Sequence, residues 1–251
     1  MKRYLVWALP VLLGACTDIS GLDGFCESER DITDVLSTSG LDRVRVLAEA
    51  GHLRVEGRAG LNEVRVFATA CARDNSDLDD IELIVDRSGS VGRIFTVVPG
   101  SAGLNARMDL RVEVPDWMLV EIDHQEGDIE VFSVSGVDIY DDSGHIEIDN
   151  IFGDVDINDS SGEVEISNID GDLYVWDDSG TLDARNIGGE VVVEEDGSGN
   201  IVLRNIDLDV YIMEDGSGDI LVDDVGGDFT VDFDFSGTIT YRNVRGRVLL
   251  P

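Results

Sequence analysis

Residues 196–233 read DGSGNIVLRNIDLDVYIMEDGSGDILVDDVGGDFTVDF, and this stretch decides the fold. It contains two complete units, which open with Asp-Gly-Ser-Gly at Asp196 and Asp215. Apolar residues alternate after each opening, as at Ile201 and Leu203, which is the period of a strand with one buried face. A second alternating pair follows a short turn. Each unit therefore predicts two short strands and two corners.

The same unit repeats through the C-terminal half at intervals of 18 or 19 residues. The Asp-x-Ser-Gly openings begin at Asp141, Asp159, Asp177, Asp196, Asp215 and Asp234. An Asn or Asp followed by a branched residue occurs at one place in each unit: Asn150, Asn168, Asn186, Asn205, Asp224 and Asn243. An antiparallel meander would not need the same residue type at the same place, whereas stacked coils bring like residues above one another.

The fold class predicted is all-β, a single-stranded parallel β-solenoid (β-helix) with coils of 18 or 19 residues. About six and a half coils at ~4.8 Å each would give a rod of roughly 30 Å. Regular repeats are expected over 125–251. Residues 39–124 alternate less regularly, as in Leu53 and Val55, and are expected to form irregular N-terminal coils that cap the rod.

The N-terminus has the layout of an export signal. Lys2 and Arg3 precede an apolar run that is too short to span a bilayer and fits a cleaved signal peptide. Leu13-Gly14-Ala15-Cys16 is similar to a bacterial lipobox. We expect a signal peptide over 1–15, lipidation of Cys16 and a tether over 16–38. The alternative is ordinary secretion with cleavage near Ala15.

The charge is strongly negative, with 18 basic and 53 acidic residues and a net charge of −35. Such a chain repels nucleic acid and anionic headgroups and attracts cations and basic partners. Hydrophobic residues make up 43% of it in a rigid pattern, so the charge does not indicate disorder.

Two cysteines remain after Cys16, namely Cys26 and Cys71. Export makes a disulfide between them a reasonable prediction, because such bonds persist in oxidising compartments. Closing a loop of that length would stabilise the fold by roughly 4 kcal/mol.

A column of stacked aspartates is the sharpest candidate site. Carboxylates about 4.8 Å apart repel one another, so corner amides or a bound cation should offset the charge. Ca²⁺ is the cation expected, as a hard ion that takes carboxylate oxygens. The candidate ligands are Asp141, Asp159, Asp177, Asp196, Asp215 and Asp234. Turn stabilisation remains open beside this, as it does for a second acidic column through Asp154, Asp172, Glu190, Asp209 and Asp228.

The sequence does not favour catalysis, and we expect no enzyme. Arg185, Arg204 and Arg242 share one column and could serve a polysaccharide-cleaving β-helix, but Asp223 lies between two of them and predicts a salt-bridged ladder. Coils this short leave no long loops to wall a cleft. The three histidines, His52, His124 and His145, are dispersed and expected at the surface; Trp117 and Trp176 are expected to pack at coil edges.

The repeats resemble the putative-adhesin β-repeat family, also called Toastrack, of bacterial exported proteins. The resemblance covers roughly residues 40 to 251. It rests on Leu53-x-Val55-x-Gly57, on Val112-x-Val114-Pro115, and on Asp-Gly-Ser-Gly-x-Ile at Asp196 and Asp215. It implies a right-handed β-helix in the cell envelope and brings no catalytic residues.

Three functions follow as hypotheses. The first is a lipid-anchored, non-catalytic binding or adhesion module of the cell envelope, at the outer rather than the inner membrane, with a surface protein, a glycan or a cationic peptide as partner and no nucleic acid. The second is an envelope structural or sensing component that binds cations or cationic peptides. The third, more remote, is a polysaccharide-active enzyme.

Overall fold

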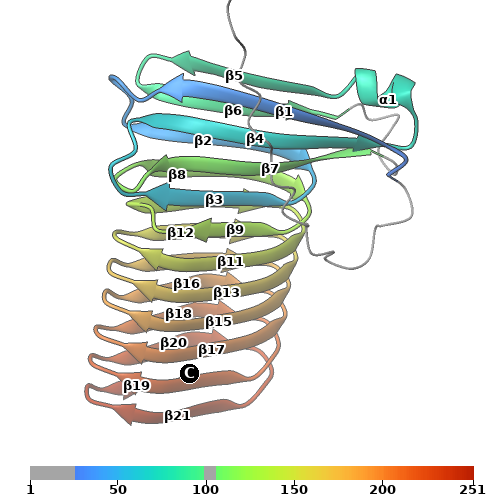
Figure 1. Cartoon of the computed structure of the whole chain (residues 1–251). Coiled ribbons are helices and arrows are strands. Elements are labelled where there is room, and N and C mark those ends of the chain that lie inside the picture. The colour runs from blue at the N-terminus through green and yellow to red at the C-terminus, as the bar shows by residue number, and fades with distance from the viewer. Residues whose placement is uncertain (1–25, 99–105) are drawn as a thin grey trace, which may run out of the picture.

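The computed structural model of the chain describes residues 26–98 and 106–251. Two sheets of 11 strands lie face to face, and their strands are stacked along a common axis (Figure 1). The predicted all-β solenoid is confirmed. One short helix, α1 (Asn75–Asp79), precedes β5 at the N-terminal end of the stack.

The first sheet, called sheet A, carries the strands that follow each Ser-Gly corner. Its strands, in spatial order, are β1 (Ser28–Ser37), β4 (Glu63–Ala72), β7 (Ala106–Pro115), β3 (Leu53–Arg58), β9 (Ile129–Phe132), β11 (Gly144–Ile151), β13 (Gly162–Ile169), β15 (Gly180–Ile187), β17 (Gly199–Ile206), β19 (Ile220–Val225) and β21 (Ile239–Val244).

The second sheet, called sheet B, carries the strands that end in the repeated aspartates. Its strands, in spatial order, are β22 (Val248–Leu249), β20 (Phe229–Asp234), β18 (Val210–Asp215), β16 (Val191–Asp196), β14 (Leu173–Asp177), β12 (Val155–Asp159), β10 (Gly136–Asp141), β8 (Leu119–Glu126), β2 (Arg43–Ala50), β6 (Val91–Val97) and β5 (Glu82–Ser88).

From β8 onward each coil consists of one strand of sheet B followed by one strand of sheet A. All pairings in this part are parallel, and like residues stack, as Asp159 does on Asp177 and Gly162 on Gly180. The regular stack thus begins at Leu119, slightly before the boundary expected at residue 125. The stacking confirms that identity at fixed positions marks a parallel solenoid.

The change from 18 to 19 residues per coil has a local cause in sheet B. The register between β14 and β16 shifts after Val175, so that Trp176 pairs with Glu195 and Glu194 is the extra residue. Such a bulge sets two neighbouring side chains on the outer face and returns the next one, Asp196, to the interior. The longer coils therefore keep the inward aspartate in line.

The asparagine column has a conformational role that the sequence pattern did not reveal. Asn168, Asn186 and Asn205 each have φ 58°, in the left-handed region that Asn tolerates better than most residues. This bend breaks the two-residue alternation, so the branched residue after each Asn also points inward. Amides also bond along the axis: Asn186 Nδ2 donates to Asn168 Oδ1 at 2.9 Å and Asn205 Nδ2 to Asn186 Oδ1 at 2.8 Å.

The N-terminal region differs from the irregular coils expected there. The coil β2–β3 lies between coil β6–β7 on one side and coil β8–β9 on the other, so it is inserted between two coils formed later in the chain. Strands β1, β4 and β5 pair antiparallel to their neighbours. The end of the stack is therefore built from antiparallel strands, and the single-stranded parallel pattern holds only beyond it.

The tether expected over 16–38 is wrong for its last part. Ser28–Ser37 forms β1, the edge strand of sheet A, paired over its whole length with β4. Most side chains of this segment are exposed, so apolar and polar residues alternate only weakly along it. The sequence therefore gives little indication of a strand here. Cys26 and Cys71 form the predicted disulfide, with Cα atoms 5.5 Å apart, and it fastens the start of β1 to β4.

The core runs unbroken between the two sheets. Each regular coil supplies inward apolar residues from both strands, such as Val155, Ile157, Val164, Ile166 and Ile169, all no more than 2% exposed. Burying one such side chain is worth roughly 1.5–3 kcal/mol. Within 26–98 and 106–251, no helix has the length and apolar character of a membrane span.

Candidate functional site

The repeated aspartates lie inside the solenoid and not on its surface. Each occupies the last inward position of a sheet B strand, and five of the six are 0–4% exposed; these are Asp141, Asp159, Asp177, Asp196 and Asp215. Asp234, in the last full coil, is partly exposed. We call these six residues the aspartate ladder.

Corner amides partner part of the ladder. The backbone N–H of Ser161 donates to Asp159 Oδ1 at 3.1 Å and that of Ser179 to Asp177 Oδ1 at 3.0 Å, which is the turn chemistry expected of Asp. Both carboxylate oxygens of Asp196 and of Asp215 lack such a donor. A protonated aspartate can donate to the carboxylate stacked on it, so shared protons are the natural partners for these oxygens.

His124 ends the ladder at the N-terminal side, and here the expectation of a surface histidine is wrong. Its side chain is buried, stacked in register on Asp141. Nε2 lies 2.9 Å from the carbonyl oxygen of Gly51, which can only accept, so Nε2 carries a proton. Nδ1 lies 3.0 Å from Asp141 Oδ1. The repeat spacing could have placed this residue in the ladder, because His124 precedes Gly127 by three residues as Asp141 precedes Gly144, but the change from Asp to His concealed the match.

The surroundings favour the neutral form of four of the ladder aspartates. Burial, followed by repulsion from stacked carboxylates, raises the pKa of Asp159 and of Asp196 to about 7. Burial likewise raises the pKa of Asp177 and of Asp215 to about 6. Near neutral pH the ladder is therefore partly protonated.

The calcium prediction for the ladder stays a prediction. In the described part of the chain, no group of three or more His, Cys, Asp or Glu side chains is arranged to hold a metal ion. A cation in the ladder would also have to exchange its water shell for a buried site.

The second acidic column has a structural role. Its side chains accept from the backbone N–H one coil further on, as Asp154 Oδ1 does from Asp172 at 2.9 Å and Asp172 Oδ1 from Glu190 at 2.8 Å. Asp209 and Asp228 repeat the arrangement. These residues connect successive corners, as the turn-stabilising interpretation predicts.

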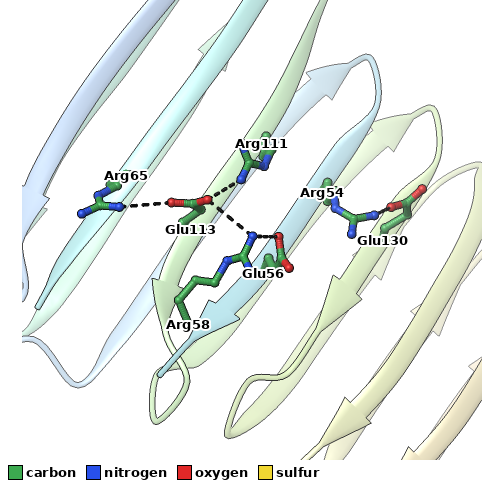
Figure 2. A network of polar contacts seen from close by, with 7 residues as sticks. All are labelled: Arg54, Glu56, Arg58, Arg65, Arg111, Glu113 and Glu130. Atoms are coloured by element: carbon green, nitrogen blue, oxygen red, sulfur yellow. Dashed lines mark hydrogen bonds and ion pairs between the residues drawn. The ribbon is translucent and has the colours of Figure 1, made fainter. Parts of the chain in front are cut away.

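The N-terminal part of sheet A carries a dense network of opposite charges on its outer face (Figure 2). The nearly buried carboxylate of Glu113 contacts Arg111, and lies 3.6 Å from Arg65 and 3.7 Å from Arg58. Glu130 is paired with Arg54. Because each arginine already has a carboxylate partner, the network joins neighbouring strands and leaves little free charge for a ligand.

In the arginine column of sheet A, the predicted salt bridges are present for two of the three arginines, and Arg185 belongs to no ion pair among the described residues. Arg185 stacks on Arg204, and Asp223 separates Arg204 from Arg242. Arg204 contacts Asp183 at 2.8 Å and Arg242 contacts Asp223 at 2.7 Å. These ion pairs give Arg204 and Arg242 a structural role between neighbouring strands.

The outer face of sheet B from β10 to β20 is different, because it combines acidic and aromatic residues without any basic ones. The six strands β10, β12, β14, β16, β18 and β20 contain no Lys, Arg or His. Their outward aromatic residues are Tyr140, Tyr174, Trp176, Tyr211 and Phe233. We call the outward side of these strands the acidic–aromatic face.

The aromatic side chains lie among carboxylates. Tyr140 is 62% exposed. Trp176 Nε1 donates to Glu195 Oε2 at 2.9 Å, so the ring of Trp176 is oriented on the face and does not pack at a coil edge. Tyr211 donates its hydroxyl to Asp232. Sequence reasoning missed this face because each aromatic was weighed singly, although their common outward position was readable from the alternation.

Two stacked carboxylates on this face have no basic partner. Asp138 stacks on Asp156, and neither belongs to an ion pair among the described residues. Burial raises the pKa of Asp138, with further contributions from Asp156 and Glu121, and burial also raises the pKa of Asp156. The face therefore holds negative charge that a cation would stabilise.

The lipidation candidate Cys16 and the signal over 1–15 lie outside the described residues. They remain predictions from the sequence.

Three solved structures illustrate the similarities found. A putative cell adhesion protein from Clostridium sporogenes has 10% identity and a TM-score of 0.33, with 89% of this chain and 100% of that chain covered. A putative adhesin from Bacteroides fragilis has 12% identity and a TM-score of 0.36, covering 89% and 98%. A putative lipid binding protein from Parabacteroides distasonis has 12% identity and a TM-score of 0.36, covering 88% and 97%.

No family model matches the sequence, and no curated protein matches it. The solenoid expected from the Toastrack resemblance is nevertheless present, as the stacked parallel coils of the chain itself show.

Proposed function

We propose that the protein is a lipid-anchored, non-catalytic binding or adhesion module of the bacterial cell envelope. The observation that carries this is the acidic–aromatic face, an extended outer sheet surface on a rigid solenoid. Aromatic side chains supply much contact area at low entropic cost and are enriched in recognition surfaces. Most of the described arginines on sheet A are engaged in ion pairs within the chain, which favours the acidic–aromatic face as the surface for a partner.

The envelope location rests on the sequence and on the disulfide. The lipobox-like tetrad ending at Cys16 predicts a lipid anchor, and the absence of Asp directly after it leans toward the outer membrane. The bond between Cys26 and Cys71 suits an oxidising compartment. The solenoid then stands on a short tether from Cys16 to the first described residues.

The anchor is tested by metabolic labelling with an alkyne palmitate in cells that produce the protein. We expect label on the wild type, none on Cys16→Ser, and the wild type in the outer-membrane fraction of a density gradient. Wild-type protein that carries no label and is released like Cys16→Ser would contradict the anchor. Recovery in the inner-membrane fraction would contradict the outer-membrane location alone.

Binding without turnover is tested with the chain from Thr17 to Pro251, which includes every described strand. We expect it to adhere to surfaces that bear a partner and to leave acidic and neutral polysaccharides uncleaved. Release of reducing ends from such a polysaccharide would favour the remote enzymatic alternative.

The second candidate is an envelope component that senses cations, which the aspartate columns suggest. Its test is a thermal melt in excess EDTA and then in millimolar Ca²⁺, with Mg²⁺ and equal ionic strength as controls. A saturating rise in Tm with Ca²⁺ alone would favour this candidate. An unchanged melt would assign the ladder to turn chemistry and proton sharing.

A further inference from the structure

From the acidic–aromatic face we infer that the partner is a basic polypeptide segment, bound in extended form by carboxylates and aromatic rings together. This inference rests on the proposed binding function and adds to it the location of the site and the chemistry of the partner.

The first support is the asymmetry of charge between the two faces. Sheet A places arginines beside its acids and pairs them, as in Arg204 with Asp183. Among the described residues, the arginines that pair with outward acids on or beside the acidic–aromatic face are Arg43 and Arg45, both in β2. The outward acids on and beside this face are Glu121, Asp123, Asp138, Asp156, Glu194, Glu195, Glu214 and Asp232.

The second support is the way in which aromatic rings alternate with polar side chains, two of them carboxylates, along the stack. In one column Asp123, Tyr140, Asn158, Trp176 and Glu195 follow one another in register. Lys and Arg side chains gain from carboxylates and from the face of an aromatic ring, and a row of both suits several cations in sequence. A partner that carries one charge would use only a small part of this surface.

The third support comes from the bulges of the 19-residue coils. The extra residue in β16, β18 and β20 doubles the outward positions, giving Glu194 with Glu195, and Met213 with Glu214. The doubled positions add carboxylates without a matching cation. An anionic bilayer or nucleic acid would be repelled by the same charges.

The probe is a fluorescein-labelled peptide of alternating Lys and Ser, with a Gln-Ser peptide and cellohexaose as neutral probes. Anisotropy is measured at 150 mM NaCl with the chain from Thr17 to Pro251. The key variant is Asp138→Asn/Asp156→Asn, and its matched control is Glu147→Gln/Glu165→Gln, which removes the same charge from stacked positions on sheet A.

We expect the Lys-Ser peptide alone to bind, at least about fivefold more weakly to the sheet B variant and unchanged to the sheet A control. Trp176→Leu and Tyr140→Leu should each weaken binding about two- to fivefold, whereas the exposed Trp117→Leu should not. Replacing two repelling carboxylates by amides preserves the strand, so the variant is expected to fold.

Equal loss in both charge variants would overturn the site, because attraction to the whole acidic molecule would then explain binding. Binding of cellohexaose with no binding of the Lys-Ser peptide would also overturn it, in favour of a glycan platform. Neither result would alter the labelling of Cys16 or the cell fractionation, so failure of this inference is distinguishable from failure of the proposed function.

Discussion

At the scale of single residues, the repeated glycines are fixed by the approach of one coil to the next. A Cβ at Gly199 would lie 1.4 Å from the carbonyl oxygen of Gly180, and a Cβ at Gly180 would lie 1.6 Å from that of Gly162. The obstacle is backbone, so it cannot rotate away. Glycine recurs at this corner because the stacking distance leaves no room for a side chain.

Replacing Gly199 should therefore be far more damaging than replacing a glycine that only requires positive φ. We expect Gly199→Ala to lower the free energy of unfolding by at least about 3 kcal/mol. Gly60→Ala, with φ +75° and open space around it, should cost only about 1–2 kcal/mol. Urea unfolding followed by circular dichroism measures both, and similar losses would show that steric contact between coils is unimportant.

At the scale of elements, the aspartate ladder couples the stability of sheet B to pH. The groups beside it are His124 at one end, Asp178 near Asp177, and its own neighbours along the stack. The inward positions of the facing sheet A strands are apolar. Because burial raises the folded-state pKa of four ladder residues, the folded state binds more protons than the unfolded state between about pH 4 and about pH 7.

Stability should consequently fall as the pH rises from about 4 to about 8. The stabilisation is complete below the unfolded pKa of Asp and is lost through the folded values of about 6 and about 7. Urea titrations at a series of pH values measure the slope. A free energy of unfolding that rises over this range would contradict protonation of the ladder.

The variant Asp196→Asn distinguishes two causes of the pH dependence: the buried ladder, and the general repulsion within a chain that has a net charge of −35. Its amide can donate to the carboxylates stacked on either side, so at pH 8 we expect it to be about 1–3 kcal/mol more stable than the wild type and less dependent on pH. The exposed Glu194→Gln, which removes one charge from the outer face beside Asp196, is the control and should keep the slope.

The disulfide is the other element-scale feature with a measurable effect. It closes a loop of 45 residues and holds the edge strand β1 on β4. Cys26→Ala/Cys71→Ala should lower the free energy of unfolding by about 2–4 kcal/mol. Added reductant should reproduce the loss in the wild type and have no effect on the double variant.

The sequence predicts the regular coils well and the N-terminal region poorly, and the reason is physical. From Gly127 onward each strand pairs with the equivalent strand of the next unit. The spacing of the repeats therefore gives the register in which the strands pair. The neighbours of β2 and β3, in contrast, come from β6 to β9, and the alternation of Val44 and Val46 specifies a strand but not its partners. The ladder residues were found by spacing, but their inward direction follows only from continuing the alternation of Val155 and Ile157 forward to Asp159.

At the scale of the whole molecule, stability is a sum over neighbouring coils. Strands β1 and β21 end sheet A, and β22 and β5 end sheet B, each with one paired neighbour. Strands in the middle, such as β9 and β11, have neighbours on both sides. Local opening should therefore begin at the ends of the stack.

Native-state hydrogen exchange should show this gradient. We expect protection to be greatest in β3, β9 and β11 and to decline toward β21 and toward the outer edge of β5, because a central strand opens only with its neighbours. Uniform protection along the stack would indicate a single cooperative unit instead.

The inserted coil β2–β3 imposes an order on assembly. A chain that emerges amino end first presents residues 43–58 well before residues 91–115, and residues 119–132 appear later still. Since β2 and β3 need both of these later segments as neighbours, the amino-terminal end of the rod cannot grow coil by coil in the order of synthesis. The repeats beyond it depend only on adjacent units, so the first stretch to be made is among the last to reach its final place.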